Sequence, residues 1–231
     1  HSSIRDIRLR DRGQPPGDLT VLSRDLFEDR EVVSWAYAAA PDRIVWCVLD
    51  NGELLSMTYV PEHDVWSWTR HEIAGEDAKV KQVSVVREGT RDVPYFGVSR
   101  TLGAQTVTLV ERLAKREQVD VTKAYYVDSG FHASYSTPVS EITGLLHLRD
   151  RSVTVLADGD ELVGLVVDDT GIVSLGDRTA SEVSVGLPYS AWVQTLDVNF
   201  QIEGVGSSEG VFKAVSEVAL KLEKSRGVEA G

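Results

Sequence analysis

The chain has 231 residues, of which 42% are hydrophobic, so it can bury a sizeable core as one large or two modest domains. Its formal net charge of −12, from 36 acidic and 24 basic residues, argues against a nucleic-acid binder, because phosphate neutralisation needs a basic face. No run approaches the roughly 18 to 20 continuous apolar residues of a membrane helix, and the start of the chain lacks an apolar signal region. We therefore expect a soluble protein without a membrane partner.

Residues 1–31 predict an N-terminal arm. His1–Ser3 resembles the remainder of a cut affinity tag, because no Met opens the chain. Charges then alternate densely, and Pro15–Gly17 favours an extended path. After Asp18, a possible cap, the spacing of Leu22 and Leu26 is compatible with one side of a short helical turn.

Residues 32–118 predict an antiparallel β-meander domain, either propeller-blade-like or a sandwich. Short apolar, β-branched and aromatic runs each stop at a turn signal, and this is the pattern of consecutive antiparallel strands. The turn signals are Asp50–Gly52, Pro61–Asp64, Ala74–Gly75 and Glu88–Thr90.

Apolar residues at both parities in residues 53–60 predict a strand that is covered on both faces. Leu55, Met57 and Tyr59 point to one side, whereas Leu54 and Val60 point to the other. We expect each face of this part of the sheet to meet another layer.

Aromatic residues are dense in the same region. Trp66 and Trp68 lie two apart and form a flat apolar wall, and Trp35 and Trp46 lie close by in sequence. Such density is typical of core or subunit contacts. The single cysteine, Cys47, lies in an apolar run, which predicts a buried small hydrophobe and not a nucleophile.

Residues 119–200 predict a second unit, a small β-barrel, after the polar break at residues 114–123. Its runs of four to seven residues are joined by tight turns, and Asp158–Asp160 predicts a hairpin turn with positive φ. Pro188 predicts an edge or a bend. Residues 201–231 predict a Gly-rich loop, a short helix and a strand that returns to the first domain. The fold class is mainly β with little helix.

No constellation in the sequence carries a recognisable chemistry. His63, His71, His132 and His147 do not form a metal-ligand pair at i, i+2 or i, i+4. The acidic turn Asp158–Glu161 lacks the spaced ladder of a calcium loop, and phosphate-binding and nucleophile-elbow motifs are missing. We predict no catalytic, cofactor-binding or metal-binding residue, and hence a protein that is not an enzyme.

The order of these blocks resembles a known family. The first block of quoted residues comprises Asp18–Ser23, Trp35–Tyr37, Pro41, Ile44–Trp46, Asp50–Leu55, Thr58–Tyr59 and Trp68–His71. It is similar to bacteriophage tail proteins of the tail-nozzle or tail-tubular type. A second block comprises Glu111–Leu113, Tyr126–Gly130, Ile142–Leu145, His147–Leu148, Val153–Gly159 and Val185–Tyr189. It resembles the family's FCCH-like small β-barrel, and Ser225–Gly227 with Gly231 is similar to the strand and turn that follow it.

The resemblance implies a structural component of a phage or prophage tail. Such proteins form rings, often six-fold, at the distal nozzle or tube, and they guide the DNA exit channel. The implied partners are copies of the chain itself and other tail proteins, while DNA passes without specific binding. The implied location is the virion tail, and the host cytoplasm during assembly.

Two other classes stay open. The wall formed by Trp66 and Trp68, with the abundant carboxylates, is compatible with a carbohydrate-binding or carbohydrate-degrading tail module. A propeller-like interaction adaptor would use the same sheet. Tryptophans buried in the meander favour the scaffold, whereas a shallow aromatic platform beside two carboxylates favours the sugar module.

Overall fold

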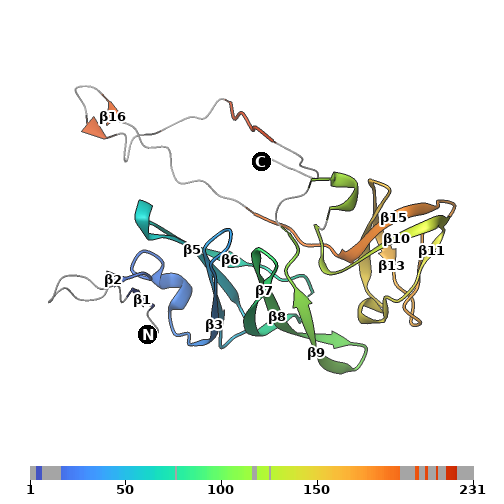
Figure 1. The fold of residues 1–231 in the computed structure, drawn as a ribbon, viewed down its shortest axis with the longest axis horizontal. Coiled ribbons are helices and arrows are strands. Elements are labelled where there is room, and N and C mark those ends of the chain that lie inside the picture. Colours follow the sequence, from blue (N-terminus) through green and yellow to red (C-terminus); the bar gives the residue numbers. More distant parts are fainter. Residues whose placement is uncertain are drawn as a thin grey trace. The chain divides into compact units, whose positions relative to one another are not determined.

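The computed structural model describes residues 4–6, 17–75, 77–115, 119–124 and 126–192, with short pieces at 201–202, 206–207, 212 and 217–222. The chain divides into two units, residues 1–190 and 191–231. Every strand pairing is antiparallel, and the helical turns of the described residues are all short 3-10 turns (Figure 1). The prediction of a mainly β, antiparallel fold is confirmed. None of the helices in the described part of the chain is long and apolar enough to cross a membrane.

The first sheet is a four-stranded meander. Its strands follow one another in chain order: β3 (Val32–Ala38), β4 (Ile44–Leu49), β5 (Leu54–Val60) and β6 (Val65–His71). The β4–β5 turn contains Gly52 at φ +90°, and the β5–β6 turn is the 3-10 turn η2 (Pro61–His63) followed by Asp64 at φ +51°. These turns lie where the turn chemistry of the sequence predicted them.

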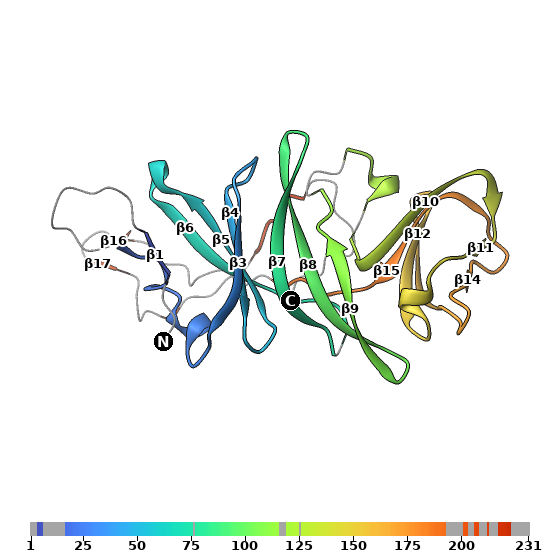
Figure 2. The same cartoon turned by 60° about the horizontal axis from the view of Figure 1, so that its bottom comes forward.

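The second sheet has three strands: β7 (Lys79–Glu88), β8 (Arg91–Leu102) and β9 (Gln105–Arg112). It lies beside the first sheet, with β7 next to β3 (Figure 2). The Ser34 hydroxyl on β3 accepts a hydrogen bond from the N–H of Val83 at 3.1 Å and donates one to its C=O at 3.4 Å. A side chain thus links two strands that do not pair through their backbones.

One core cluster contains side chains from both sheets. Trp46 from the first sheet packs against Phe96 from the second, with ring centroids 5.3 Å apart in an edge-to-face arrangement. Val48 and Leu54 join from the first sheet. The first two sheets therefore share one core cluster.

A second core cluster lies on the other face of the first sheet. Leu55 and Met57 are buried there against Leu19 and Phe27 of the N-terminal segment, while Leu54 faces the opposite cluster. The prediction that both faces of β5 are covered is therefore confirmed. Cys47 is fully buried in this second cluster, as predicted, and burial raises the pKa of its thiol to about 12.

The N-terminal segment reaches this cluster through short elements: β1 (Arg5–Asp6), β2 (Gly17–Asp18) and the 3-10 turn η1 (Arg24–Phe27). Asp18 accepts hydrogen bonds from the N–H and hydroxyl of Thr20, which makes an Asx turn. The expected short helical turn is present as η1, but Leu22 precedes it and is 86% exposed, so the expectation that Leu22 and Leu26 share one side of the turn is wrong. Most of the expected extended arm, residues 1–3 and 7–16, lies outside the described residues.

The third sheet is formed by residues 128–187. Its strand order is β10 (Asp128–Val139), β15 (Ala180–Leu187), β12 (Ser152–Ala157) and β13 (Asp160–Val166). Its smaller elements are the β11 (Glu141–Ile142) and β14 (Val173–Ser174) pair and the 3-10 turns η3 (Val121–Lys123) and η4 (Leu146–Leu148). The predicted closed barrel is not observed among the described strands: β10 and β13 each have a single neighbour, so the sheet is open.

The core of the third sheet is aliphatic and separate from the other two clusters. Val153, Val155, Val183 and Val185 are fully buried in it. The β12–β13 turn contains Asp158 at φ +49° and Gly159 at φ +92°, so the predicted hairpin with positive φ is confirmed.

The second unit is described only in short pieces, among them β16 (Gln201–Ile202) paired with β17 (Gly206–Ser207). The expected short helix near residues 211–217 lies largely outside the described residues. The predicted domain boundaries at residues 31, 118 and 200 stay predictions.

Candidate functional site

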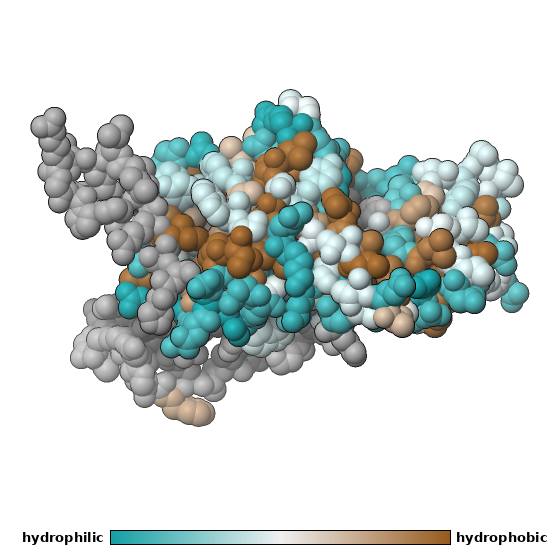
Figure 3. All heavy atoms as spheres, turned by 90° about the horizontal axis from the view of Figure 1, so that it is seen from below, coloured by the Kyte–Doolittle hydropathy of each residue, from teal (hydrophilic) through white to brown (hydrophobic). Residues whose placement is uncertain are grey.

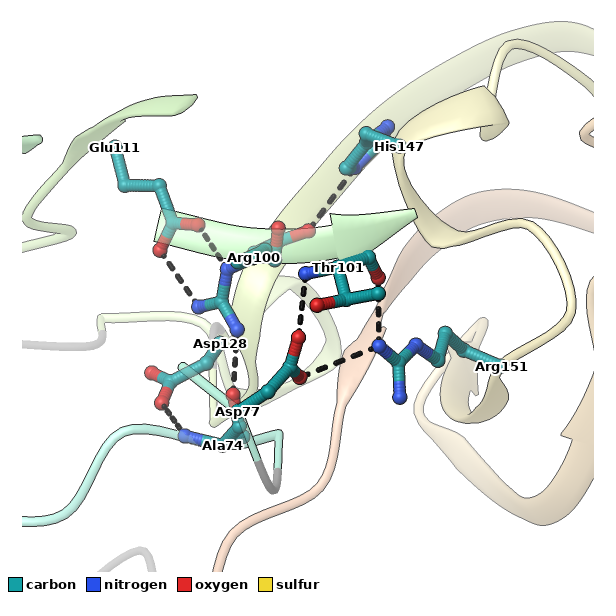
Figure 4. Close-up of polar contacts among 9 residues, drawn as sticks. Ala74, Asp77, Arg100, Thr101, Glu111, Asp128, His147 and Arg151 are labelled. Carbon is teal, nitrogen blue, oxygen red and sulfur yellow. Dashed lines mark hydrogen bonds and ion pairs between the residues drawn. The ribbon is translucent and has the colours of Figure 1, made fainter. Parts of the chain in front are cut away.

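A group of polar residues links the second sheet to the third, and we call it the junction cluster (Figure 4). Its members are Ala74, Asp77, Arg100, Thr101, Glu111, Asp128 and Arg151. They come from the β6–β7 connection, β8, β9, the start of β10 and the residue before β12.

Arg100 is the centre of the junction cluster and is only 3% exposed. Its Nε and Nη2 donate to the two carboxylate oxygens of Glu111, at 2.5 and 3.0 Å. Its Nη1 donates to the C=O of Ala74. This forked ion pair satisfies a guanidinium that could not otherwise be buried at acceptable cost.

Asp128 approaches the same connection from the third sheet. Its Oδ2 accepts a hydrogen bond from the N–H of Ala74 at 2.7 Å. Burial raises the pKa of Asp128, and the charge of Glu111 acts in the same direction, against the Ala74 N–H and the Arg100 charge. Both backbone groups of Ala74 are therefore held by charged side chains from two different sheets.

Asp77 and Arg151 form a second group of contacts beside Arg100. The N–H of Thr101 donates to Asp77 Oδ2 at 2.6 Å. Hydrogen bonding by Thr101, that of its side chain first, lowers the pKa of Asp77. Arg151 Nη2 donates to the C=O of Thr101 at 2.7 Å and lies 3.3 Å from Asp77 Oδ1. An arginine of the third sheet thus holds the end of β8.

Two further contacts lie beside the junction cluster, one between the second and third sheets and one within the third-sheet region. Arg149 Nη2 donates to the C=O of Leu102 at 3.1 Å, and its guanidinium lies against the turn glycine Gly103. His147 Nε2 lies 3.1 Å from the C=O of Ser129 and supports the start of β10 (Figure 4). Arg149 and Arg151 thus both donate hydrogen bonds to backbone C=O groups at the end of β8.

The junction cluster has the chemistry of a structural clamp. Its carboxylates all accept hydrogen bonds from protein donors, and neither a serine nor a cysteine nucleophile with an adjacent base lies among its members. A buried ion pair with complete hydrogen bonding fixes geometry more than it adds stability.

A cleft of about 570 Å³ lies at one end of the first two sheets. It is lined by residues 88–94 around the β7–β8 turn, residues 112–115, and, around the β3–β4 turn, Ala38, Ala40, Pro41, Asp42, Ile44 and Trp46. Its size is within the range of small-molecule sites, so its charged groups decide whether it can carry chemistry.

Two carboxylates of this cleft, Glu88 and Asp92, are held by neighbouring groups. Glu88 accepts hydrogen bonds from Arg112 and from the Tyr95 hydroxyl, which lower its pKa to about 2. Asp92 accepts from Arg87 and from the N–H groups of residues 39 and 40, and its pKa is lowered by these contacts, that of Arg87 first. Acids this strong stay ionised at neutral pH and are poor proton donors. Glu88 and Asp92 are therefore poorly suited to act as general acids.

The aromatic wall expected at Trp66 and Trp68 is half-buried. Trp68 packs edge-to-face on Phe27, with centroids 4.9 Å apart, and its Nε1 donates to the C=O of Leu19 at 2.8 Å. The exposed aromatics lie instead on β3, where Trp35 is 67% and Tyr37 is 42% exposed. Both point away from the inter-sheet cluster.

The four histidines singled out in the sequence lie in separate places. His71 contacts Ser56 Oγ at 2.7 Å, His132 contacts Ser184 Oγ at 3.0 Å, and His147 contacts the Ser129 C=O. Within the described ranges, no three His, Cys, Asp or Glu side chains gather in a way that could hold a metal ion.

Sequence reasoning missed the junction cluster, although one signal was present. Phe96, Val98 and Arg100 share a parity on β8, which places an arginine in the row that faces the core. Glu111 pairs with Phe96 across the hairpin and so belongs to the same face. A charged residue of each sign on one core-facing surface is a sequence signal for a buried ion pair.

Neither a protein-family model nor a curated protein matches the chain. What carries a functional proposal is thus the geometry above, together with the resemblance quoted from the sequence.

Proposed function

We propose that the chain is a structural subunit of a phage or prophage tail, in the distal nozzle or tube. The resemblance of the two sequence blocks to tail-nozzle proteins motivates the proposal. In this role the chain forms a ring with copies of itself, contacts other tail proteins and surrounds the channel through which DNA leaves.

The junction cluster is the observation that carries the proposal. A ring subunit must keep its β units in fixed geometry while neighbouring copies pull on them. Arg100, Asp128 and Arg151 hold one loop and one hairpin from both sides through charge-assisted hydrogen bonds. Such a clamp supports a load-transmitting scaffold, and a catalyst would need polar groups that converge on a ligand.

The finer architecture belongs to the same proposal. Residues 32–118 are the meander block, and residues 119–200 are the block that resembles the FCCH-like domain, with an open sheet among its described strands in place of a closed barrel. The net charge of −12 suits a channel wall that DNA passes without adhesion, because like charges repel.

Electron microscopy tests the proposal. The protein is imaged alone and in phage or induced prophage particles, with a gold-labelled antibody raised against the purified chain. We expect the label at the distal tail and a ring in side and end views. Label confined to the host cytoplasm or to the capsid would refute the tail assignment.

One observation favours a second function, carbohydrate binding by a tail module. Trp35 and Tyr37 lie two apart on β3, so both rings project from the same face of the sheet, where they are exposed. Exposed aromatic faces in a row are a common platform for sugar rings.

Glycan-array binding separates the two functions. The wild-type protein is compared with Trp35→Ala, and Trp192→Ala is the matched control, because Trp192 is also exposed but lies outside the sheets. Carbohydrate binding requires a glycan that the wild type and the control retain and Trp35→Ala loses. An empty array removes this second candidate.

A further inference from the structure

β9 is a free sheet edge in the part of the chain that the structure describes. It pairs with β8 in unbroken register from Gln105 to Arg112 and has no strand on its other side. An unbroken free edge is a template for another strand.

The backbone hydrogen bonds of Thr101 show which N–H and C=O groups of β9 point away from β8. Its N–H donates to Asp77 and its C=O accepts from Arg151, so Thr101 and its partner Thr106 are a non-hydrogen-bonded pair. The alternation of an antiparallel ladder then directs the N–H and C=O of Thr106, Thr108 and Val110 away from β8. The hydrogen bond from the Leu113 N–H to the Pro94 C=O agrees with this alternation.

The side chains of β9 are amphipathic. Val107 and Leu109 face the same side as Arg100 and Val98, and they are only half-buried. They belong to none of the three core clusters. One more strand beside β9, with apolar residues on that side, would cover this row.

Three other sheet edges, β13, β10 and β6, are less suited to a new strand. β13 is interrupted by a register shift that includes Gly164, which has φ +72°. β10 has two register shifts and contains Pro138. Such bulges and prolines blunt edges against pairing. β6 is regular but places the exposed Arg70 in its apolar row.

Residues 217–222 of the second unit have alternating apolar side chains that could lie beside the apolar row of β9. Val218, Leu220 and Leu222 alternate with Ala219 and Lys221, and the three apolar side chains are 69%, 56% and 56% exposed. Extended backbone with this period has one apolar and one polar side. The described segment, residues 217–222, belongs to no sheet.

Figure 3 shows only separate apolar patches among hydrophilic side chains on the visible face, so a broad apolar interface is not available there.

We propose that residues 217–222 of one copy add as a strand to the β9 edge of a second copy. The apolar row of the segment would cover Val107 and Leu109, and Ala219 and Lys221 would lie beside Thr108 on the polar side. This strand exchange would be the contact between neighbouring copies in the proposed ring, so the inference rests on the proposed function. Backbone hydrogen bonds supply the affinity and the alternating side chains set the register.

Cross-linking between two single-substitution variants tests the exchange. Thr108→Cys protein is mixed with Ala219→Cys protein and treated with a short bismaleimide, and Cys47 stays unreactive because it is fully buried. We expect a covalent heterodimer, identified by mass spectrometry of the linked peptides. Val163→Cys on the bulged β13 edge replaces Thr108→Cys in the control, and we expect at least tenfold less product. Equal yields in the two mixtures would overturn the proposal.

A double Thr108→Cys/Ala219→Cys variant separates exchange from self-docking. Links within single chains, without links in the mixture of the two single variants, would mean that the segment folds onto its own β9. That outcome overturns the exchange between copies.

Blocking the edge gives an independent measurement. Thr108→Pro removes an outward N–H without removing a hydrogen bond to β8, and Thr108→Ala is the matched control. By analytical ultracentrifugation we expect Thr108→Pro and Leu220→Glu to weaken self-association at least tenfold, with Thr108→Ala unchanged. Equal association of the Pro and Ala variants, or a wild type that stays monomeric at the highest soluble concentration, would overturn the proposal. Antibody label at the distal tail together with such a result would leave the proposed function standing and remove only this contact.

Discussion

Replacement of Arg100 by Met would remove the central cation of the junction cluster while it keeps a long apolar stem. The change leaves Glu111 without its guanidinium and the Ala74 C=O without its donor. It also removes the positive charge that partly offsets the burial of Asp128. Three polar groups would lose their compensation in one substitution.

The expected cost follows from the burial of the pair. Arg100 has a side-chain exposure of 4% and Glu111 of 19%. Breaking a buried ion pair from one side costs about 3–5 kcal/mol, because the remaining charge is left without a partner. Glu111 can recover some hydration through its exposed part, so we expect about 3 kcal/mol for Arg100→Met.

Urea unfolding followed by tryptophan fluorescence and circular dichroism measures this cost. The matched control is Arg178→Met, since the pair of Arg178 with Asp160 has side-chain exposures of 59% and 80%. Such a surface pair contributes about 0–1 kcal/mol. The double variant Arg100→Met/Glu111→Leu removes both charges and should recover at least about 1 kcal/mol relative to Arg100→Met alone.

The result that would refute this reasoning is a cost for Arg100→Met no larger than that of Arg178→Met. A double variant less stable than Arg100→Met would contradict the explanation through an orphaned Glu111. Hydrogen exchange at the Ala74 amide gives a local measurement: we expect faster exchange in Arg100→Met and no change in Arg178→Met.

Three further predictions concern backbone conformation, pH and the thiol. Gly171→Ala should lower the free energy of unfolding by at least about 3 kcal/mol, and Gly176→Ala by about 1–2 kcal/mol. Both glycines have positive φ, but a Cβ at Gly171 would lie 2.6 Å from the Leu146 nitrogen, whereas one at Gly176 would meet nothing within 4 Å. Equal urea unfolding midpoints of the two variants would contradict this. Asp128→Asn keeps an acceptor for the Ala74 N–H and removes a carboxyl whose folded pKa is raised by burial. The folded state therefore binds the proton of Asp128 more tightly than the unfolded state does. The stability that this group contributes is thus lost as pH rises through its folded pKa. The variant should therefore gain urea resistance over the wild type at pH 7 and lose that advantage toward pH 4, and an advantage independent of pH would argue against the assignment. Cys47 should not react with a thiol-specific disulfide reagent at pH 7.5 until urea unfolds the chain, and rapid labelling of the native protein would contradict its burial and its pKa of about 12.

Local patterns determined most of the strands and turns. The alternation of Leu54 with Leu55 and Met57 predicted a strand with two covered faces, because side-chain direction in a strand depends only on parity. The turn at Asp158 and Gly159 was predictable for a similar reason, since positive φ is a property of a few adjacent residues. The burial of Cys47 followed from its apolar neighbours.

Tertiary structure alone decided which of these surfaces meet. Parity places Trp35 and Trp68 on sheet faces, but only the path of the N-terminal segment covers Trp68 with Phe27 and leaves Trp35 exposed. Residues distant in sequence, such as Arg100 and Asp128, approach the same backbone unit because two sheets pack against one connection. Periodicity specifies the faces of each strand, whereas the choice of partner depends on long-range packing that no local pattern contains.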